Sequence, residues 1–231
     1  MKTMLQKTKH FIKESIFGPG RRPMKIRLGL YRGLTLWLDP AKELMFYLGL
    51  YEAETSKWLS SKGKKIKSLV DVGAGCGELS MWALKHPQVE QVLAYDGSHE
   101  RWSVFEKNCR DNGFSLDSRL ETVKGLFFGL EESHKEFQAL KKLPDPILVK
   151  IDVDGGELSI LHRMKPVLSL RKFFLLIETH SRELDESCFK LLEGMGYQCT
   201  RIPQGWWRIL VPEQRPTDFN QWIVAVPAEI K

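Results

Sequence analysis

The sequence predicts an α/β sandwich: a mostly parallel seven-stranded sheet with an antiparallel hairpin strand at its C-terminal end and helices on both faces. Two observations predict this class. From Ile66 onward, short apolar runs alternate with helical segments at spacings typical of repeated βα units, which form parallel sheets. After these units, two strand-like runs at 197–202 and 221–226 are separated by a loop without room for a long crossover helix, which favours antiparallel pairing.

Length and composition are those of one globular domain. The chain has 231 residues, of which 42% are hydrophobic and 28% are charged, so it is neither disordered nor collagen-like. It has no run of about 18 apolar residues that could span a membrane. The four cysteines form no C-x-x-C pair, and the N-terminus lacks the apolar core of a signal peptide. We therefore expect a cytoplasmic protein without a zinc or disulfide scaffold.

The positive charge is concentrated at the N-terminus. Residues 1–38 carry nine basic residues and one acid, whereas the rest of the chain has a net charge of −2. Residues 2–17 have the periodicity of an amphipathic helix with a basic side, and residues 24–38 alternate like a β-hairpin around Tyr31 to Gly33. We expect residues 1–45 to form a basic extension and 46–231 the main domain. The helix either lies on its own domain or makes a weak contact with a membrane surface or another protein.

Five strands of the main domain are expected before the terminal hairpin, with a helix after each. They lie near 66–72, 91–96, 120–127, 147–153 and 172–179. The first is followed by a glycine-rich turn within SLVDVGAGCGELS, residues 68–80, and by a helix that begins at Glu78. Glycines there allow a ligand to approach the backbone outside the carboxyl ends of the strands. The residues predicted to bind a cofactor at this turn are Asp71, Gly73, Gly75, Cys76 and Gly77.

The spacing disfavours NAD as this cofactor. The dinucleotide fingerprint G-x-G-x-x-G would need a glycine at position 78, where the chain has Glu78. A carboxylate there also opposes a pyrophosphate at the helix N-terminus. The second strand ends in Asp96, followed by Gly97 and Ser98, and an acid at this place can bind both hydroxyls of an adenosine ribose. The pattern resembles the first two motifs of Rossmann-like S-adenosylmethionine-dependent methyltransferases, and Asp71 would suit that cationic ligand.

A second cluster of ionisable residues follows the fourth and fifth strands. It comprises KIDVDGGELSIL at 150–161 and LLIETH at 175–180. Alternation places Lys150, Asp152 and Asp154 on one side of a strand, and buried charges need partners or a function. The two strings, together with GLYE at 49–52, resemble the FkbM-type methyltransferase family over about residues 45–226. Asp154 stands where that family usually has Glu.

The resemblance implies transfer of a methyl group to a hydroxyl of a sugar, polyketide or other small metabolite. Two residues are candidates for the base: Asp152, at the end of its strand, and His180, oriented by Glu178; a substrate that needs no base is a third possibility. Lys150 is expected to pair with the acids. Glu52 is expected on a helix before the first strand, either in contact with the cofactor or the substrate, or in solvent.

Three further alternatives stay open. Asp152, Asp154 and Glu178 could hold a divalent metal ion, which the sequence does not establish. A nucleic-acid methyltransferase would share the fold, but the N-P-P-Y type of string is absent and the main domain lacks a basic surface. A non-catalytic protein that binds S-adenosylmethionine would keep the glycine turn but would not need the second cluster. The acceptor and the oligomeric state are not encoded in any motif of this chain.

Overall fold

A computed structural model describes residue 15 and residues 18–115, 117–125, 135–171, 173–209 and 219–228. The amphipathic helix expected at 2–17, with its proposed membrane or protein contact, therefore lies outside the described residues apart from Ser15. The expected N-terminal hairpin is present: β1 (Arg22–Lys25) pairs antiparallel with β2 (Thr35–Leu38). Its strands are shorter than the alternation predicted.

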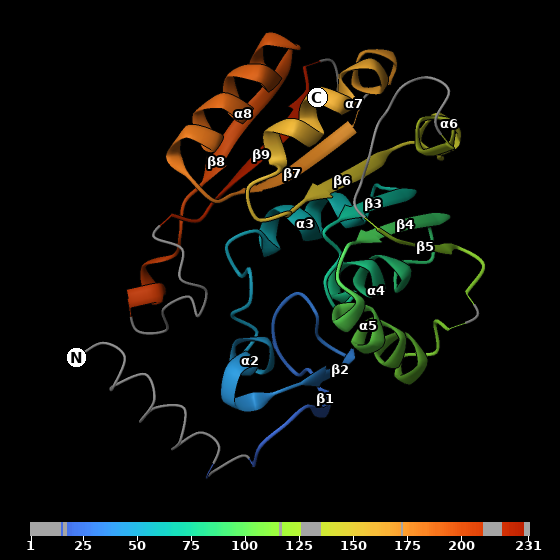
Figure 1. Ribbon diagram of the computed structural model, residues 1–231, viewed down its shortest axis with the longest axis vertical. Helices are drawn as coiled ribbons and strands as arrows, with labels where there is room; N and C mark the ends of the chain where they lie inside the picture. The colour runs from blue at the N-terminus through green and yellow to red at the C-terminus, as the bar shows by residue number, and fades with distance from the viewer. Residues whose placement is uncertain are drawn as a thin grey trace.

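The main sheet confirms the predicted fold class. It has seven strands in the order β5-β4-β3-β6-β7-β9-β8 (Figure 1). The first five strands of this order are parallel to one another, and β9 runs antiparallel to both β7 and β8. The strands are β3 (Ser68–Val72), β4 (Gln91–Asp96), β5 (Leu120–Lys124), β6 (Ile147–Ile151), β7 (Phe173–Thr179), β8 (Tyr197–Ile202) and β9 (Gln221–Pro227). The fourth strand is shorter than expected because it ends before Asp152.

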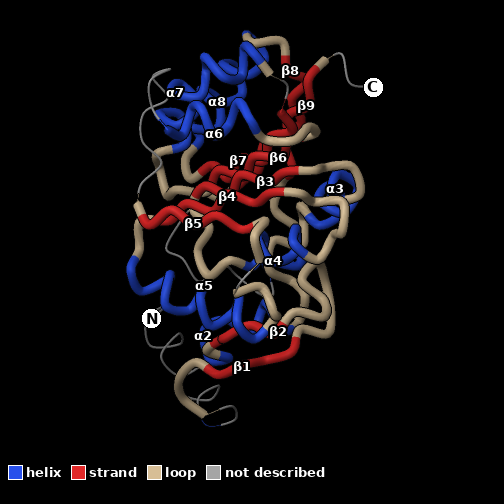
Figure 2. The backbone as a smooth tube through the Cα atoms, turned by 90° about the vertical axis from the view of Figure 1, so that its right-hand side faces the viewer, coloured by secondary structure: helices blue, strands red, loops and turns tan. Residues whose placement is uncertain are grey.

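Helices cover both faces of this sheet. The β1–β2 hairpin, α2 (Pro40–Tyr47), α3 (Ser56–Gly63), α4 (Glu78–Leu84) and α5 (His99–Asp111) lie on one side. The other side carries α6 (Lys135–Lys142), α7 (Glu157–Leu170) and α8 (Arg182–Gly194) (Figure 2). A short 3-10 helix, η1 (Trp206–Ile209), follows β8. Side-chain caps fix helix starts that the sequence signals: Ser98 accepts from Arg101 N–H at α5, and Ser181 accepts from Leu184 N–H at α8.

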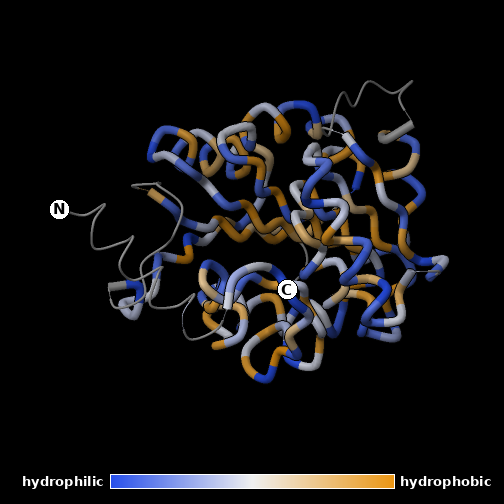
Figure 3. The backbone as a smooth tube through the Cα atoms, turned by 60° about the horizontal axis from the view of Figure 1, so that its bottom comes forward, coloured by the Kyte–Doolittle hydropathy of each residue, from blue (hydrophilic) through white to orange (hydrophobic). Residues whose placement is uncertain are grey.

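Two apolar cores result from the alternation of side chains along the central strands. On β3, Leu69 packs into the core shared with the hairpin and α3 to α5, whereas Val70 and Val72 pack into the core under α6 to α8. Runs of hydrophobic residues accordingly cross the interior of the trace (Figure 3). Among the described residues, no helix combines the length and the apolar character needed to cross a bilayer.

The hairpin is attached to the main sheet through α5. Thr35 and Trp37 donate their backbone N–H groups to the side chains of Asn112 and Asn108, at 2.8 and 2.7 Å. These bonds satisfy the backbone N–H groups on the outer edge of β2, and the acceptors are side chains of a helix instead of the backbone of a further strand. The extension is therefore held over the carboxyl ends of β3 and β6, where the predicted site residues lie.

Candidate functional site

The glycine turn between β3 and α4 needs glycine at particular positions. Gly73 has φ +82°, and a Cβ there would lie 1.8 Å from the carbonyl oxygen of Asp152. Gly77 has φ +85°, and its Cβ would lie 2.6 Å from the ring of Phe105. Gly75 also has a positive φ, +58°, but a Cβ there would meet nothing closer than Oε2 of Glu78 at 3.8 Å. The turn thus packs directly on the end of β6 and on α5 while leaving its own tip accessible.

Asp96 at the end of β4 points toward this turn. Its Oδ2 accepts from the Gly75 N–H at 2.8 Å, and its Oδ1 accepts from the Ser98 N–H at 2.7 Å. Arg101 lies 3.7 Å from Oδ2. The carboxylate thereby fixes the tip of the glycine turn. Gly97 is exposed beside it, whereas Asp96 is buried.

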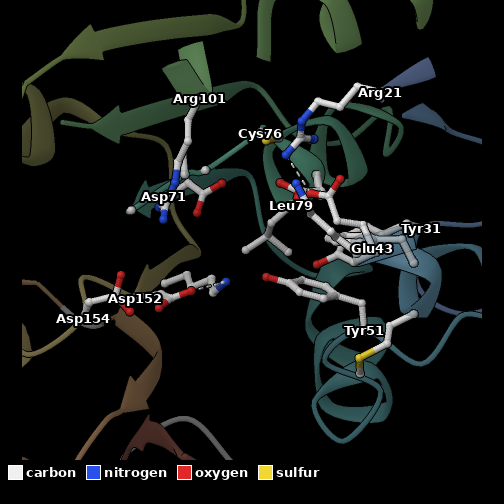
Figure 4. A pocket seen from close by; sticks show the side chains of 18 residues that line it. Arg21, Tyr31, Glu43, Tyr51, Asp71, Cys76, Leu79, Arg101, Asp152 and Asp154 are labelled. Atoms are coloured by element: carbon white, nitrogen blue, oxygen red, sulfur yellow. Dashed lines mark hydrogen bonds and ion pairs between the residues drawn. The ribbon is translucent and has the colours of Figure 1, made fainter. Parts of the chain in front are cut away.

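A cleft of about 310 Å³ opens between the glycine turn, the end of β6 and the N-terminal extension (Figure 4). Of the residues predicted to bind the cofactor, Asp71, Gly73, Gly75 and Cys76 line it, whereas Gly77, Asp96, Gly97, Ser98 and Glu52 are not among its lining residues. Of the predicted catalytic residues, Asp152 lines the cleft, and Glu178 and His180 lie outside its lining. Asp154 joins Asp152 at the rim.

A layer of largely buried charged side chains lies at and beneath the floor of the cleft. Asp71, Lys150 and Glu178 sit on adjacent parallel strands, and their side chains share one face because each stands two residues from an apolar neighbour on that face. Lys150 is paired with acids, as expected: Nζ lies 2.9 Å from Glu52 and 3.4 Å from Asp152. Burial alone would lower the pKa of Lys150, but these carboxylates outweigh it and raise the pKa well above its usual value.

The position predicted for Glu52 is wrong. It lies in the turn between α2 and α3 with φ +45°, not on a helix, and only 2% of its surface is exposed. Its carboxylate faces Lys150 instead of the cleft or solvent, because the ammonium is the nearest group that can compensate a buried negative charge. Glu52 therefore holds Lys150 in place.

Two acids of the cleft have raised pKa values. Burial raises the pKa of Asp71 to about 6, although Lys150 and a 2.7 Å hydrogen bond from Ser80 Oγ act against this. Burial also raises the pKa of Glu78 to about 7. Both carboxyl groups are therefore ready to become anions when a cation enters the cleft. Burial raises the pKa of the Cys76 thiol, in agreement with a packing role in the turn.

His180 is oriented by Glu157, not by Glu178 as the sequence analysis expected. Its Nδ1 lies 2.8 Å from Oε1 of Glu157, which also accepts from the Gly155 N–H at 3.0 Å. Glu178 lies 3.7 Å from Nε2 and instead accepts hydrogen bonds from Asn220 and Trp222 on or next to β9, at 2.7 and 3.3 Å. The long C-terminal excursion to β9 separates these donors from β7 in sequence, which is why the motif alone did not show them.

The strand alternation predicted through Asp154 also fails. Because β6 ends at Ile151, Asp152 and Asp154 belong to the turn that follows, and Asp154 has φ +50°. The Asp154 side chain is 56% exposed, whereas that of Asp152 is 11% exposed. Asp152, Glu178 and His180 each offer one ligand atom, and these atoms lie within 4.8 Å of one another. Among the described residues, this cluster rather than Asp152–Asp154–Glu178 has the spacing to hold a metal ion.

The far wall of the cleft was not predicted from the sequence, and it is supplied by the extension, α2 and the turn after α2. Tyr51 stacks on Phe46 with ring centroids 3.8 Å apart, and it points its hydroxyl toward the side of Asp152 (Figure 4). Tyr31 completes this aromatic wall, and Arg21 and Glu43 form an ion pair of 2.9 Å across its rim. Tyr51 falls within the GLYE string but had no role assigned to it, and Tyr31, Arg21 and Glu43 belong to no motif, because only the tertiary fold places these residues opposite the glycine turn. Trp206 and Trp207, at the start of η1, do not line the cleft.

No family model matches the chain, and no curated protein matches it significantly. Solved structures do resemble it. The precorrin-8W decarboxylase of Methanobacterium thermoautotrophicum has 20% identity and a TM-score of 0.51, covering 76% of this chain and 89% of that one. A Streptococcus pneumoniae protein provisionally assigned as a tRNA (m1A22) methyltransferase has 17% identity and a TM-score of 0.51, covering 76% and 70%.

An O-methyltransferase of Bacillus cereus, solved with S-adenosylhomocysteine, has 12% identity and a TM-score of 0.50, covering 74% of this chain and 77% of that one. At these identities the likeness establishes the fold. The chain has the Rossmann-like sheet of these proteins.

Proposed function

We propose that this protein is an S-adenosylmethionine-dependent methyltransferase that acts on a hydroxyl oxygen of a small metabolite. One observation carries the proposal: a single cleft joins the glycine turn after β3 to the carboxylate of Asp152 after β6. In an open α/β sheet, ligands bind outside the carboxyl ends of the strands, and this cleft lies there. Its volume of about 310 Å³ is at the lower end of small-molecule sites.

The glycine turn and its acids suit the methyl donor. Asp71 and Glu78 line the cleft and would face the positive amino and sulfonium groups, which favour the ionised form of both acids. Asp96 already accepts one backbone N–H on each oxygen and keeps further acceptor capacity for the ribose hydroxyls. One of the three similar solved structures supports a donor of this type, because it was solved with S-adenosylhomocysteine.

Asp152 is the group proposed to meet the acceptor. A hydroxyl oxygen placed about 3 Å from the sulfonium methyl carbon attacks that carbon as the carbon–sulfur bond breaks. The bonding pair stays on sulfur, giving the neutral S-adenosylhomocysteine, and the hydroxyl proton passes to a carboxylate oxygen of Asp152. Lys150 and Glu52 keep this carboxylate in position from below. Glu178 and His180 act from behind Asp152, not from the cleft surface.

The choice of oxygen as acceptor rests on the sequence. The strings KIDVDGGELSIL and LLIETH resemble FkbM-type methyltransferases, and the structure groups Asp152, Glu157, Glu178 and His180 from these two strings within one cluster. The described surface around the cleft carries acids at its Asp152 side, which disfavours a polyanionic nucleic acid there.

The test is transfer of a labelled methyl group from S-adenosylmethionine to a panel of sugars, polyketide alcohols and phenols, with total tRNA as a separate acceptor. We expect label on a small hydroxyl compound, and Asp152→Asn to lower turnover about 10²–10⁴-fold while the Kd of the donor changes only a few-fold. Glu183→Gln, an exposed residue of α8 that does not line the cleft, is the control and should keep full turnover. Label on tRNA alone, or full turnover in Asp152→Asn, would contradict the proposal.

A further inference from the structure

His180 lies at the centre of a buried, strongly acidic cluster. Its side chain is 7% exposed, and carboxylate oxygens of four residues lie within 4.0 Å of its ring nitrogens: Asp152, Asp154, Glu157 and Glu178. Glu157 binds Nδ1, and the other three surround Nε2 at 3.4–3.7 Å. Nε2 is buried and has no hydrogen-bond partner among the described residues. Buried polar atoms normally have a partner, so this one points to a ligand.

The separations around Nε2 fit a shared metal ion better than direct contacts. Nε2 lies 3.7 Å from Asp152 Oδ1 and 3.7 Å from Glu178 Oε1, too far for hydrogen bonds. With metal–ligand bonds of about 2.0–2.2 Å, neighbouring ligands of a tetrahedral or octahedral ion lie roughly 3.0–3.6 Å apart. Side-chain movements of up to about 1.2 Å would bring the three ligand atoms, now within 4.8 Å of one another, onto one ion.

The groups around the cluster already hold each ligand in the orientation that a metal site needs. The Glu157 carboxylate fixes Nδ1 of His180 as a donor, which leaves the lone pair on Nε2. Asn220 and Trp222 anchor Glu178 from β9. The two carboxylate oxygens of Asp152 have different neighbours: Oδ2 lies 3.4 Å from Nζ of Lys150, and Oδ1 faces His180.

We propose that Asp152, Glu178 and His180 bind one divalent cation through Oδ1, Oε1 and Nε2. One imidazole nitrogen among carboxylate oxygens suits Mn²⁺ or Zn²⁺ better than Mg²⁺, which prefers oxygen ligands alone. The ion would lie at the floor of the cleft, because Asp152 lines the cleft and His180 stands directly behind it. Exposed Asp154, 3.4 Å from Nε2, is close enough to the same ion to add a further oxygen.

The role of this cation in catalysis rests on the proposed function, whereas the site itself does not. When bound, the cation would supply Lewis acidity that lowers the pKa of an acceptor hydroxyl, and Oδ2 of Asp152 would accept the hydroxyl proton. This matters because a carboxylate paired with Lys150 is by itself a weak base for an alcohol. The expected substrate class is therefore an acceptor whose hydroxyl needs activation, such as an aliphatic or sugar alcohol.

The experiment measures binding of Mn²⁺ to the full-length protein after EDTA treatment and desalting, by the loss of the free-Mn²⁺ electron paramagnetic resonance signal. We expect one Mn²⁺ per chain, displaced by Zn²⁺. His180→Ala and Asp152→Asn should abolish this binding, and Glu157→Gln, which keeps all three ligands, should weaken it about 10–100-fold. Exposed His162→Ala and Glu183→Gln are matched controls and should bind as the unaltered protein does.

Circular dichroism and the Kd of S-adenosylmethionine establish that each variant is folded. Absence of saturable Mn²⁺ binding by the unaltered protein, or unchanged binding by folded His180→Ala, would overturn the metal site. Methyl transfer that proceeds at full rate in EDTA would overturn the catalytic role of the ion and leave the proposed function standing. Mn²⁺ binding without any donor binding would have the opposite meaning: the site would stand and the proposed function would fall.

Discussion

Replacing Gly73 by alanine probes the contact between the glycine turn and the end of β6. Gly73 has φ +82°, a region that costs an L-residue roughly 1–2 kcal/mol. Its Cβ would also lie 1.8 Å from the carbonyl oxygen of Asp152, whereas real contacts begin near 3.0 Å. The two chain segments must therefore separate by the difference, 1.2 Å. The displaced group is backbone, so no side-chain rotation can relieve the clash.

This displacement has two measurable consequences. Urea unfolding should show a loss of about 3 kcal/mol or more for Gly73→Ala, since backbone strain and a displaced strand end add together. A shift of about 1 Å in Asp152 should cost roughly 100-fold in turnover with the best acceptor. The loss of turnover should exceed any loss of donor affinity, because Asp152 lies on the acceptor side of the turn.

Gly75→Ala is the matched control. Gly75 also has a positive φ, +58°, but its nearest neighbour would be 3.8 Å away, so only the backbone term of roughly 1–2 kcal/mol is expected. Gly113→Ala repeats this comparison away from the cleft, with φ +79° and open space. Equal stability of Gly73→Ala and Gly75→Ala would refute the reasoning that the turn packs on the Asp152 carbonyl.

Three further outcomes are expected. Lys150→Met should lower the free energy of unfolding, measured in urea, by about 3–5 kcal/mol, because the buried Glu52 carboxylate loses the Lys150 ammonium that pairs with it. A loss below about 1 kcal/mol would contradict this. Asp96→Asn should weaken donor binding about tenfold or more, because a hydrogen bond to a charged acceptor contributes about 1.5–3 kcal/mol. Calorimetry measures the Kd of the donor, and an unchanged Kd would show that Asp96 does not bind the donor. Donor affinity should increase as the pH rises from 5.5 to 7.5, because a cation binds the ionised forms of Asp71 and Glu78, whose pKa values are about 6 and about 7. The free energy of unfolding of the ligand-free protein should change in the opposite direction with pH. The contribution of these two acids is fully present below their unfolded pKa values near 4 and is lost as the pH rises through 6 and 7. A donor affinity that stays constant in calorimetry at pH 5.5, 6.5 and 7.5, or that changes equally in Glu78→Gln, would contradict this assignment.

The sheet could be predicted from the sequence because each of its signals is local. Apolar runs such as 147–151 and the turn at Gly73 follow from alternation and backbone sterics, which act over a few residues. The same locality explains the error at Asp154. Alternation continued past Ile151, but the backbone turns there, and periodicity does not report where a strand stops making hydrogen bonds.

Partners of buried charges could not be predicted in this way. Lys150 was expected to pair with nearby acids, yet its shortest contact is to Glu52, 98 residues away along the chain. Glu157 was visible within the motif, but its role depends on α7 beginning at that residue and presenting the carboxylate to His180. Charge compensation is a property of the folded interior, so a sequence limits the candidates without choosing among them.

The two halves of the cleft also have different origins. The side proposed for the methyl donor is built from strand ends of the main sheet, whereas the opposite wall comes from the extension, α2 and the turn after it. The rim pair Arg21–Glu43 is partly exposed, at 37% and 22%, and pairs of this kind contribute about 0–1 kcal/mol. This rim can therefore rearrange at little cost when an acceptor enters, while the buried layer around Lys150 stays fixed. If the proposed function holds, the fixed side would bind the methyl donor and the adaptable rim would adjust to the acceptor. The acceptor should accordingly be sought through residues such as Tyr51 and Arg21, and not through the glycine turn.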